Sequence, residues 1–166
     1  MDTDAGARER GRPGPSLLYA VKQVELGVRA QLDEIVRPAG VTALQYTALS
    51  VLARRDGLTS AELARTSFVT PQSMADLVGA LERAGLIART RDAANRRQLL
   101  ISITADGQAL LGRLAGPVAR LEERMVDGMD ADDRARFRDY LNRAREALDA
   151  RGPTLADIRN PDSSSV

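Results

Sequence analysis

Apolar residues recur at steps of three and four along most of this chain, which is the spacing of one buried face of an α-helix. The pattern predicts helices over residues 17–37, 43–57, 60–66, 71–85, 105–129 and 132–150. Between them, apolar and polar residues alternate in the segments 86–90 and 97–103, as they do in half-buried strands. The apolar positions that would share one face are Leu86, Ala88, Leu99, Ile101 and Ile103. The pattern therefore predicts a mainly α protein with one small β-hairpin.

Several helix ends carry signals of their own. Two helices begin with a capping box, in which the first and fourth residues bond each other's backbone N–H groups: Thr42 with Gln45, and Thr59 with Glu62. The helix 71–85 is predicted to begin at Thr70 and Pro71. A threonine side chain at this place accepts a hydrogen bond from an N–H of the first turn, and the N–H that proline lacks would have no partner within the helix. Gly85 ends that helix, and Pro117 is expected to kink or split the helix 105–129.

Composition narrows the class of protein. Of the 166 residues, 43% are hydrophobic and 3% aromatic, so the core must be aliphatic, as in helix-on-helix packing. The chain has neither Cys nor His, which excludes disulfides, thiolate and imidazole metal sites, and the commonest acid–base catalyst. An enzyme would have to use carboxylate pairs or Lys22, and no such pair lies in a cleft-forming motif. We therefore expect no enzymatic activity, no cofactor and no metal.

The ends of the chain differ from its body. Residues 1–16 and 151–166 offer little to bury and are predicted to be tails. The N-terminal segment lacks the apolar core of a secretory signal, and no apolar run approaches the ~20 residues of a membrane span. We expect a cytoplasmic protein.

Positive charge is concentrated in one part of the chain. The whole sequence has a net charge of +1, whereas residues 54–104 hold eight arginines and five carboxylates, a net charge of +3. The predicted hairpin is the densest spot, with Arg89, Arg91, Arg96 and Arg97. A local basic patch of this kind indicates a nucleic-acid-binding surface.

The helix 71–85 has a face suited to close approach by a partner. Its apolar residues Met74, Leu77, Val78 and Leu81 predict the buried side. The opposite face presents mostly short side chains, namely Gln72, Ser73, Ala75, Asp76, Gly79, Ala80 and Arg83. An ordinary solvated face is the alternative interpretation, but it would be richer in Glu, Lys and Arg. The sequence therefore favours a helix that enters a groove of DNA.

This order of helices, capped helix, arginine-rich hairpin and long final helices resembles the MarR (multiple antibiotic resistance regulator) family of bacterial repressors. The resemblance extends from about Leu17 to Ala150, and the segments that carry it are TSAELA, VTPQSMADLVGALERAGLIAR, DAANRR and LLISITADGQALL. It implies a winged helix-turn-helix at residues 42–104, with N- and C-terminal dimerisation helices at residues 17–41 and 105–150. It further implies a homodimer whose two winged helices bind successive major grooves of a pseudo-palindromic operator.

The resemblance also implies a DNA-binding surface formed by the start of the capped helix, its exposed face and the wing. The candidate residues are Thr70, Pro71, Gln72, Ser73, Asp76, Arg83, Arg89, Arg91, Arg96 and Arg97. Gln72, Ser73 and Asp76 would lie near base edges. The helix N-terminus would hold a phosphate, and Arg96 or Arg97 would lie in or over the minor groove.

One position departs from the family pattern. The family usually has Asp-Arg-Arg at the wing, where the acid orients an arginine, and here the residues are Asn95, Arg96 and Arg97. A neutral amide accepts a hydrogen bond more weakly than a carboxylate. This wing is therefore expected to be less pre-organised, unless Asp92 takes over the role. Arg97 leads into the second strand, so a structural role is the alternative to DNA contact.

A ligand cleft between the dimerisation helices and the winged helix is the last feature that the resemblance implies. Candidate lining residues are Val21, Leu44, Tyr46, Leu49 and Leu111, and an ordinary core position is the favoured alternative for each. Without Cys or His, thiol-based peroxide sensing and His-based zinc sensing are excluded, so any effector should be a small organic molecule.

Two functions follow from these observations. The first is a sequence-specific dimeric transcriptional regulator, a repressor released from double-stranded DNA by a small organic ligand. The alternative is a winged-helix protein-interaction module without DNA binding. The weak net charge and Asn95 support the alternative, whereas the wing arginines oppose it.

Overall fold

The computed structural model describes residues 14–67 and 69–150. The elements along the chain are α1 (Leu17–Val36), the 3₁₀ helix η1 (Arg37–Ala39), α2 (Ala43–Arg54), α3 (Ser60–Ser67), α4 (Pro71–Arg83), β1 (Ile87–Arg91), β2 (Leu99–Ile103), α5 (Ala105–Met125) and α6 (Ala131–Ala150). The two strands pair antiparallel, from Ile87 opposite Ile103 to Arg91 opposite Leu99. The predicted fold class, mainly α with a small β-hairpin, is confirmed. The predicted tails lie almost wholly outside the described residues.

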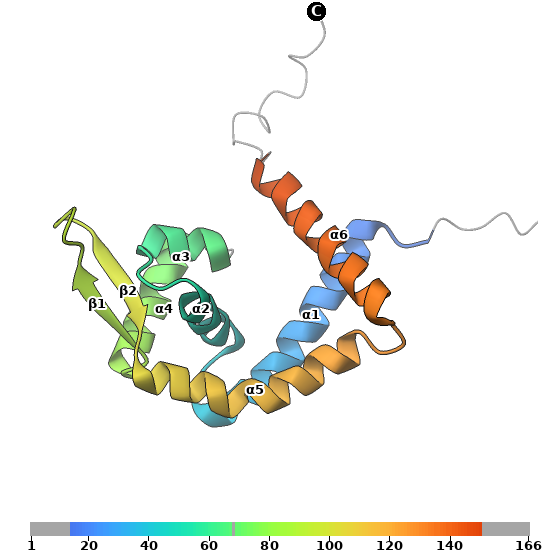
Figure 1. The fold of residues 1–166 in the computed structure, drawn as a ribbon, viewed down its shortest axis with the longest axis horizontal. Helices are drawn as coiled ribbons and strands as arrows, with labels where there is room; N and C mark the ends of the chain where they lie inside the picture. The colour runs from blue at the N-terminus through green and yellow to red at the C-terminus, as the bar shows by residue number, and fades with distance from the viewer. Residues whose placement is uncertain (1–13, 68, 151–166) are drawn as a thin grey trace, which may run out of the picture. The chain divides into compact units, whose positions relative to one another are not determined.

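The chain divides into two compact units, one ending at Met125 and the other beginning at Val126. The first unit contains α1 to α5 with the hairpin, and the second contains α6. Within the first unit, the hairpin lies beside α4, and α5 leads away from the end of β2 to pack along α1 (Figure 1). None of the described helices is long and apolar enough to cross a membrane.

An aliphatic core holds the first unit together. Its largest fully buried side chains are Leu49, Leu52, Leu58, Leu63, Met74, Leu81 and Ile101. Val36 of α1 and Leu110 and Leu114 of α5 belong to the same cluster. The core therefore contains residues from before position 42, from between 42 and 104, and from after 104. The division of the chain at those two positions into dimerisation helices and a winged helix stays a prediction.

Both predicted capping boxes are present. The Thr42 hydroxyl accepts the Gln45 N–H at 3.2 Å, and Gln45 Oε1 accepts the Thr42 N–H at 2.9 Å. At α3, Glu62 Oε2 accepts the Thr59 N–H at 2.9 Å and the Thr59 hydroxyl at 2.8 Å. The backbone bond from Thr59 is the main reason that the pKa of Glu62 lies below its ordinary value, followed by the hydroxyl bond. Local sequence signals therefore set where α2 and α3 begin.

Side chains also tie α1 to its neighbours. Asp33 Oδ1 accepts the N–H of Ala43 at 2.6 Å, so a residue of α1 caps the first turn of α2. Further along, the Arg124 guanidinium of α5 donates to Gln31 Oε1 at 2.5 Å. Hydrogen bonds thus join the C-terminal half of α1 to α2 and to α5.

The predicted split at Pro117 does not occur, because α5 runs from Ala105 to Met125 with Pro117 inside it. A proline within a helix removes one N–H donor and leaves the carbonyl four residues earlier unpaired. That carbonyl belongs to Arg113, which is exposed, so water can hydrate it.

The predicted phase of the first strand is wrong. Ile87 is 2% exposed, whereas Ala88 is exposed. Leu86 is buried, but it precedes β1 and lies in the turn after Gly85, where its N–H donates to the Leu81 carbonyl at 3.0 Å. Its burial belongs to the turn, so an alternation counted from it is displaced by one residue.

Thr104 joins the hairpin to the end of α4. Its N–H donates to the Leu86 carbonyl at 3.1 Å, and its hydroxyl donates to the Gly85 carbonyl at 2.7 Å and accepts the Gly107 N–H at 3.1 Å. A Cβ on Gly107 would lie 2.3 Å from the Leu86 carbonyl oxygen and 2.7 Å from Ile103 Cγ1. Glycine is therefore required for α5 to begin this close to the turn.

Replacing Gly107 should test this contact. We expect Gly107→Ala to lower the free energy of unfolding by about 1–3 kcal/mol, because the backbone carbonyl it meets cannot rotate away as a side chain does. Urea denaturation of the variant and the parent measures the change. Gly112→Ala is the matched control in the same helix, since a Cβ there meets nothing within 4 Å and alanine favours helix. Equal stability of the two variants would contradict the argument.

Candidate nucleic-acid interface

Among the described residues, the first turn of α4 has one backbone N–H without a hydrogen-bond partner. Thr70 Oγ1 accepts the Ser73 N–H at 3.2 Å, and the two hydroxyls lie 2.9 Å apart. Pro71 has no N–H, and the Met74 N–H donates to the Thr70 carbonyl at 2.9 Å. The N–H of Gln72 therefore remains available to an anion such as a DNA phosphate.

The two faces of α4 are divided as the sequence predicts. Met74, Leu77, Val78 and Leu81 are buried. On the other side the exposed residues include Gln72, Ser73, Ala75, Asp76 and Arg83, with Gly79 and Ala80 partly exposed. A partner surface can therefore approach the backbone of α4 closely along this side.

The turn between α3 and α4 is anchored to the core. The Val69 N–H donates to the Ala64 carbonyl at 3.1 Å, and the Val69 side chain packs against the buried cluster. Phe68 lies outside the described residues. This anchoring fixes the point at which α4 begins.

The base of the hairpin is bonded to the loop between α2 and α3. Leu58 and Ile101 exchange backbone hydrogen bonds of 3.2 and 2.8 Å, and Asp56 Oδ1 accepts the Ile103 N–H at 3.2 Å. These bonds all reach β2. They hold that strand against the body of the first unit.

The tip of the hairpin is shaped by two side-chain caps. Asp92 Oδ1 accepts the Ala94 N–H at 2.9 Å, and Asn95 Oδ1 accepts the Arg97 N–H at 3.2 Å. The Gln98 N–H then donates to the Asn95 carbonyl at 2.8 Å. Asn95 therefore orders the backbone of the tip, a role that a neutral amide oxygen can fill.

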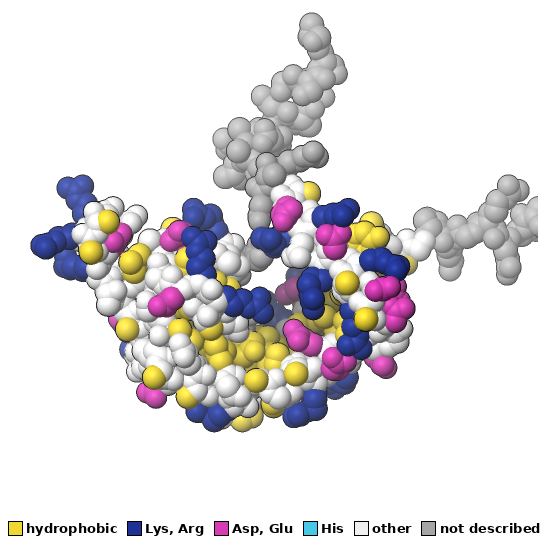
Figure 2. All heavy atoms as spheres, viewed as in Figure 1, with side chains coloured by type: hydrophobic (Ala, Val, Ile, Leu, Met, Phe, Trp, Pro, Cys, Tyr) yellow, Lys and Arg dark blue, Asp and Glu magenta, His cyan; other side chains and the backbone are white. Residues whose placement is uncertain are grey.

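Three of the four hairpin arginines are free. Arg91, Arg96 and Arg97 are exposed, and within the described part of the chain none of their guanidinium groups has an ion-pair partner. Figure 2 shows basic side chains gathered at the tip of the hairpin. Neither Asp92 nor Asn95 holds one of these guanidinium groups, so the three cations are available to an external anion.

Arg89 differs from the other three. Its guanidinium donates to Glu82 Oε2 near the end of α4, in an ion pair whose side chains are 38% and 37% exposed. The hydrogen bond to Arg89 is the main cause that lowers the pKa of Glu82, and it raises the pKa of Arg89. Glu82 was not among the residues singled out from the sequence. A seven-residue separation across a glycine turn offers no local pattern that would reveal the pair.

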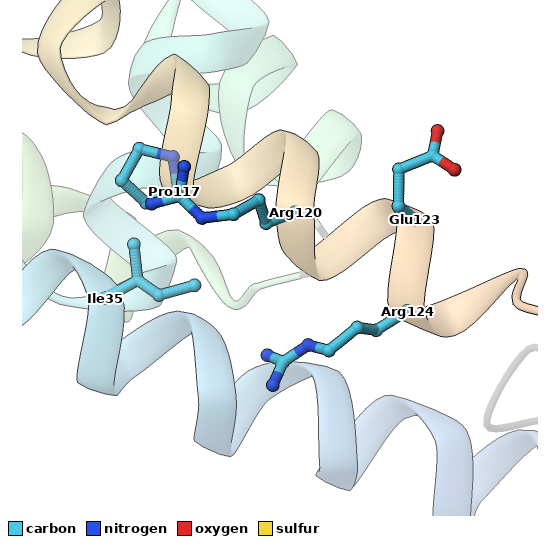
Figure 3. Close-up of a pocket in the computed structure, with 5 residues that line it drawn as sticks. All are labelled: Ile35, Pro117, Arg120, Glu123 and Arg124. Atoms are coloured by element: carbon cyan, nitrogen blue, oxygen red, sulfur yellow. The ribbon is translucent and has the colours of Figure 1, made fainter.

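A surface groove of about 410 Å³ lies between α1 and α5. In Figure 3, Ile35 of α1 lies opposite Pro117 of α5, Arg124 reaches from α5 toward α1, and Glu123 points away from α1. Arg120 completes the lining. This groove was not predicted from the sequence, although Pro117, Arg120 and Arg124 share one helix face at steps of three and four.

The five ligand-binding candidates from the sequence lie elsewhere. Leu49 is fully buried, and Leu44, Tyr46 and Leu111 pack against the same core. Val21 is 57% exposed on α1. The structure does not bring the five together around the groove. Among the described residues, no cluster of three or more carboxylates is placed to hold a metal ion.

Comparisons with known proteins agree with this geometry. Residues 39–98 match the family described as MarR family. The chain is 34% identical over 127 residues to the HTH-type transcriptional repressor Rv2887 of Mycobacterium tuberculosis. The aligned region covers 76% of this chain and 89% of that protein.

Two solved structures are similar in fold and in sequence. One is the Mycobacterium tuberculosis MarR family protein Rv2887 in complex with p-aminosalicylic acid, with a TM-score of 0.64 and 31% identity over 78% of this chain and 98% of that one. The other is the transcriptional repressor CouR bound to a 23-mer DNA duplex, with a TM-score of 0.69 and 30% identity over 78% of this chain and 92% of that one. With its capped helix α4 and its arginine-bearing hairpin, the chain belongs to the MarR family of winged helix-turn-helix transcriptional regulators.

Proposed function

We propose that this protein is a homodimeric transcriptional repressor that binds a pseudo-palindromic operator through α4 and the β1–β2 wing. The observation that carries the proposal is the combination, on one compact unit, of an open and short-chained face on α4 with three unpaired wing arginines. We assign the chain no catalytic role and propose that it acts on DNA in the cytoplasm. Similar proteins are named as transcriptional repressors, and one was solved on a DNA duplex.

The roles of the DNA-binding residues follow from their positions. Gln72, Ser73 and Asp76 present polar groups at the N-terminal half of α4, the part of a recognition helix that contacts base edges. The free N–H of Gln72 and the dipole of α4 suit a phosphate. Arg96 and Arg97 at the wing tip suit a narrow minor groove, where the negative potential is strongest.

A second copy of the chain would account for the apolar side chains left uncovered on two helices. Leu17 and Leu18 of α1 are 85% and 81% exposed, and Tyr140 and Leu148 of α6 are 61% and 73% exposed. On each of the two helices, large apolar side chains exposed in this way suit a protein interface. We therefore assign residues 17–41 and 105–150 to dimerisation, with residues 42–104 as the DNA-binding part.

A small organic anion is the ligand class that we propose as effector. The groove between α1 and α5 combines the apolar Ile35 and Pro117 with the guanidinium groups of Arg120 and Arg124. An apolar wall with a few fixed cations suits an aromatic or aliphatic acid. Among the similar structures, one was solved with p-aminosalicylic acid.

A gel-shift experiment tests the central proposal. We expect the protein to retard a duplex taken from upstream of its own gene, or one selected from a random pool, with affinity that falls as salt rises. The logarithm of the binding constant should fall by about 0.9 for each phosphate contact per tenfold increase in salt. Failure to retard the upstream duplex and to enrich any sequence from the pool would refute DNA recognition and leave the protein-interaction module.

Arg96→Ala tests the role of the wing. Loss of a backbone or minor-groove cation should weaken binding to all duplexes alike and reduce the salt slope by about 0.9. Titrations at several salt concentrations measure both. Arg113→Ala removes another exposed arginine, on α5 and outside the proposed DNA-binding part, and should change neither. A loss restricted to one base position would assign Arg96 to base recognition instead.

Gln72→Ala tests the role of the α4 face. If Gln72 forms a bidentate contact with one base, its removal should reduce discrimination at that position by ~1–3 kcal/mol. The measurement is the affinity for a panel of duplexes that differ at single positions. A uniform loss across the panel would show that Gln72 contacts the backbone and carries no sequence preference.

A further inference from the structure

We propose that Glu82 and Arg89 form a positioning pair that sets the wing against the recognition helix, and that Arg89 is not itself a DNA contact. This inference rests on the proposed DNA-binding function and deepens it. It divides the four hairpin arginines into three that face outward and one that acts within the protein.

The pair spans the turn between α4 and β1. Glu82 belongs to the last turn of α4, and its backbone carbonyl accepts the Gly85 N–H at 2.9 Å. Its carboxylate accepts a hydrogen bond from the guanidinium of Arg89, the third residue of β1. One residue therefore bonds both the turn and the strand that leaves it.

The position of Arg89 on the strand directs its side chain to the body of the protein. Alternate residues of a strand share a face, so Arg89 shares its face with Ile87, which is 2% exposed. Its partner in the register is Ile101, which is 1% exposed. Arg91 has the same phase but lies farther out, opposite Leu99, which is 46% exposed. The free cations thus begin where contact with the body ends.

The strand that carries Arg89 lacks the other attachments of the hairpin. Leu58 and Asp56 bond to Ile101 and Ile103 of β2, so β2 lies between Leu58 and β1. Among the described residues, β1 has β2 as its only strand neighbour. Besides the burial of Ile87 in the common core, the contact of Arg89 with Glu82 is the ion pair that joins β1 to α4 among the described residues.

A DNA contact and a positioning pair predict opposite effects at residue 82. If Arg89 bound DNA, removing the carboxylate of Glu82 would free its guanidinium and remove a negative charge near the phosphates, so binding would strengthen. If the pair positions the wing, the same substitution releases β1, and binding weakens even though a negative charge has been removed. The sign of the change decides between them.

The experiment uses the full-length chain, its variants Glu82→Gln, Arg89→Gln and the double variant, and the duplex that the parent chain selects from a random pool. We expect each single variant to bind roughly two- to fivefold more weakly, which is the range for an exposed ion pair. The double variant should bind no more weakly than either single variant, because both break one contact. Both side chains are more than a third exposed, so the variants should fold, and a thermal melt of each confirms it.

Arg91→Gln is the matched control, since Arg91 lies on the same strand and has no ion-pair partner among the described residues. It should reduce the salt slope by about 0.9, as a phosphate contact does, and should not change amide hydrogen exchange in the free protein. Glu82→Gln should instead speed amide exchange in β1 of the free protein. Unchanged or tighter DNA binding by Glu82→Gln, or an added loss in the double variant, would overturn the proposal. If the parent chain selects no duplex, the proposed function fails, and the exchange rates alone decide the role of the pair.

Discussion

The contact between Gly107 and the turn at Leu86 is the constraint on which the first unit depends. A hydrogen atom in place of a side chain at Gly107 lets α5 begin against the Leu86 carbonyl, and Thr104 bonds both sides of that junction. The recognition helix, the wing and the long helix α5 therefore share one rigid point. Backbone contacts at this junction join the start of α5 to the turn after α4 and to the end of β2.

This junction provides a physical connection between a bound ligand and the proposed DNA-binding surface. The groove between α1 and α5 lies along the same helix whose first turn contains Gly107. An anion bound by Arg120 and Arg124 would act on α5 directly, and α5 leads to the turn that carries both α4 and the wing. A ligand shifts such a system only by the difference in its affinity for the two arrangements. If the proposed effector binds in the groove, that difference arises there.

The arginines of the wing have two different roles within a short segment. Asp92 and Asn95 order the backbone of the tip, and Arg89 is bound to Glu82 at the root. The hairpin arginines without an ion-pair partner among the described residues are those beyond the body of the protein. Asn95 in place of the family's usual acid is compatible with this arrangement, because its acceptor bonds a backbone N–H and is not required by an arginine side chain.

Local chemistry allowed the sequence by itself to determine the fold class and most helix boundaries. Capping boxes, Pro71 and Gly85 act within a few residues, and the family pattern of the capped helix and the arginine hairpin could be found without coordinates. The phase of β1 could not, since the burial of Leu86 arises from a turn. The partner of Arg89 and the lining of the groove also required the tertiary structure, because both join residues whose proximity depends on how separate elements pack. Side-chain type determines what each residue can bind, and packing alone decides what it meets.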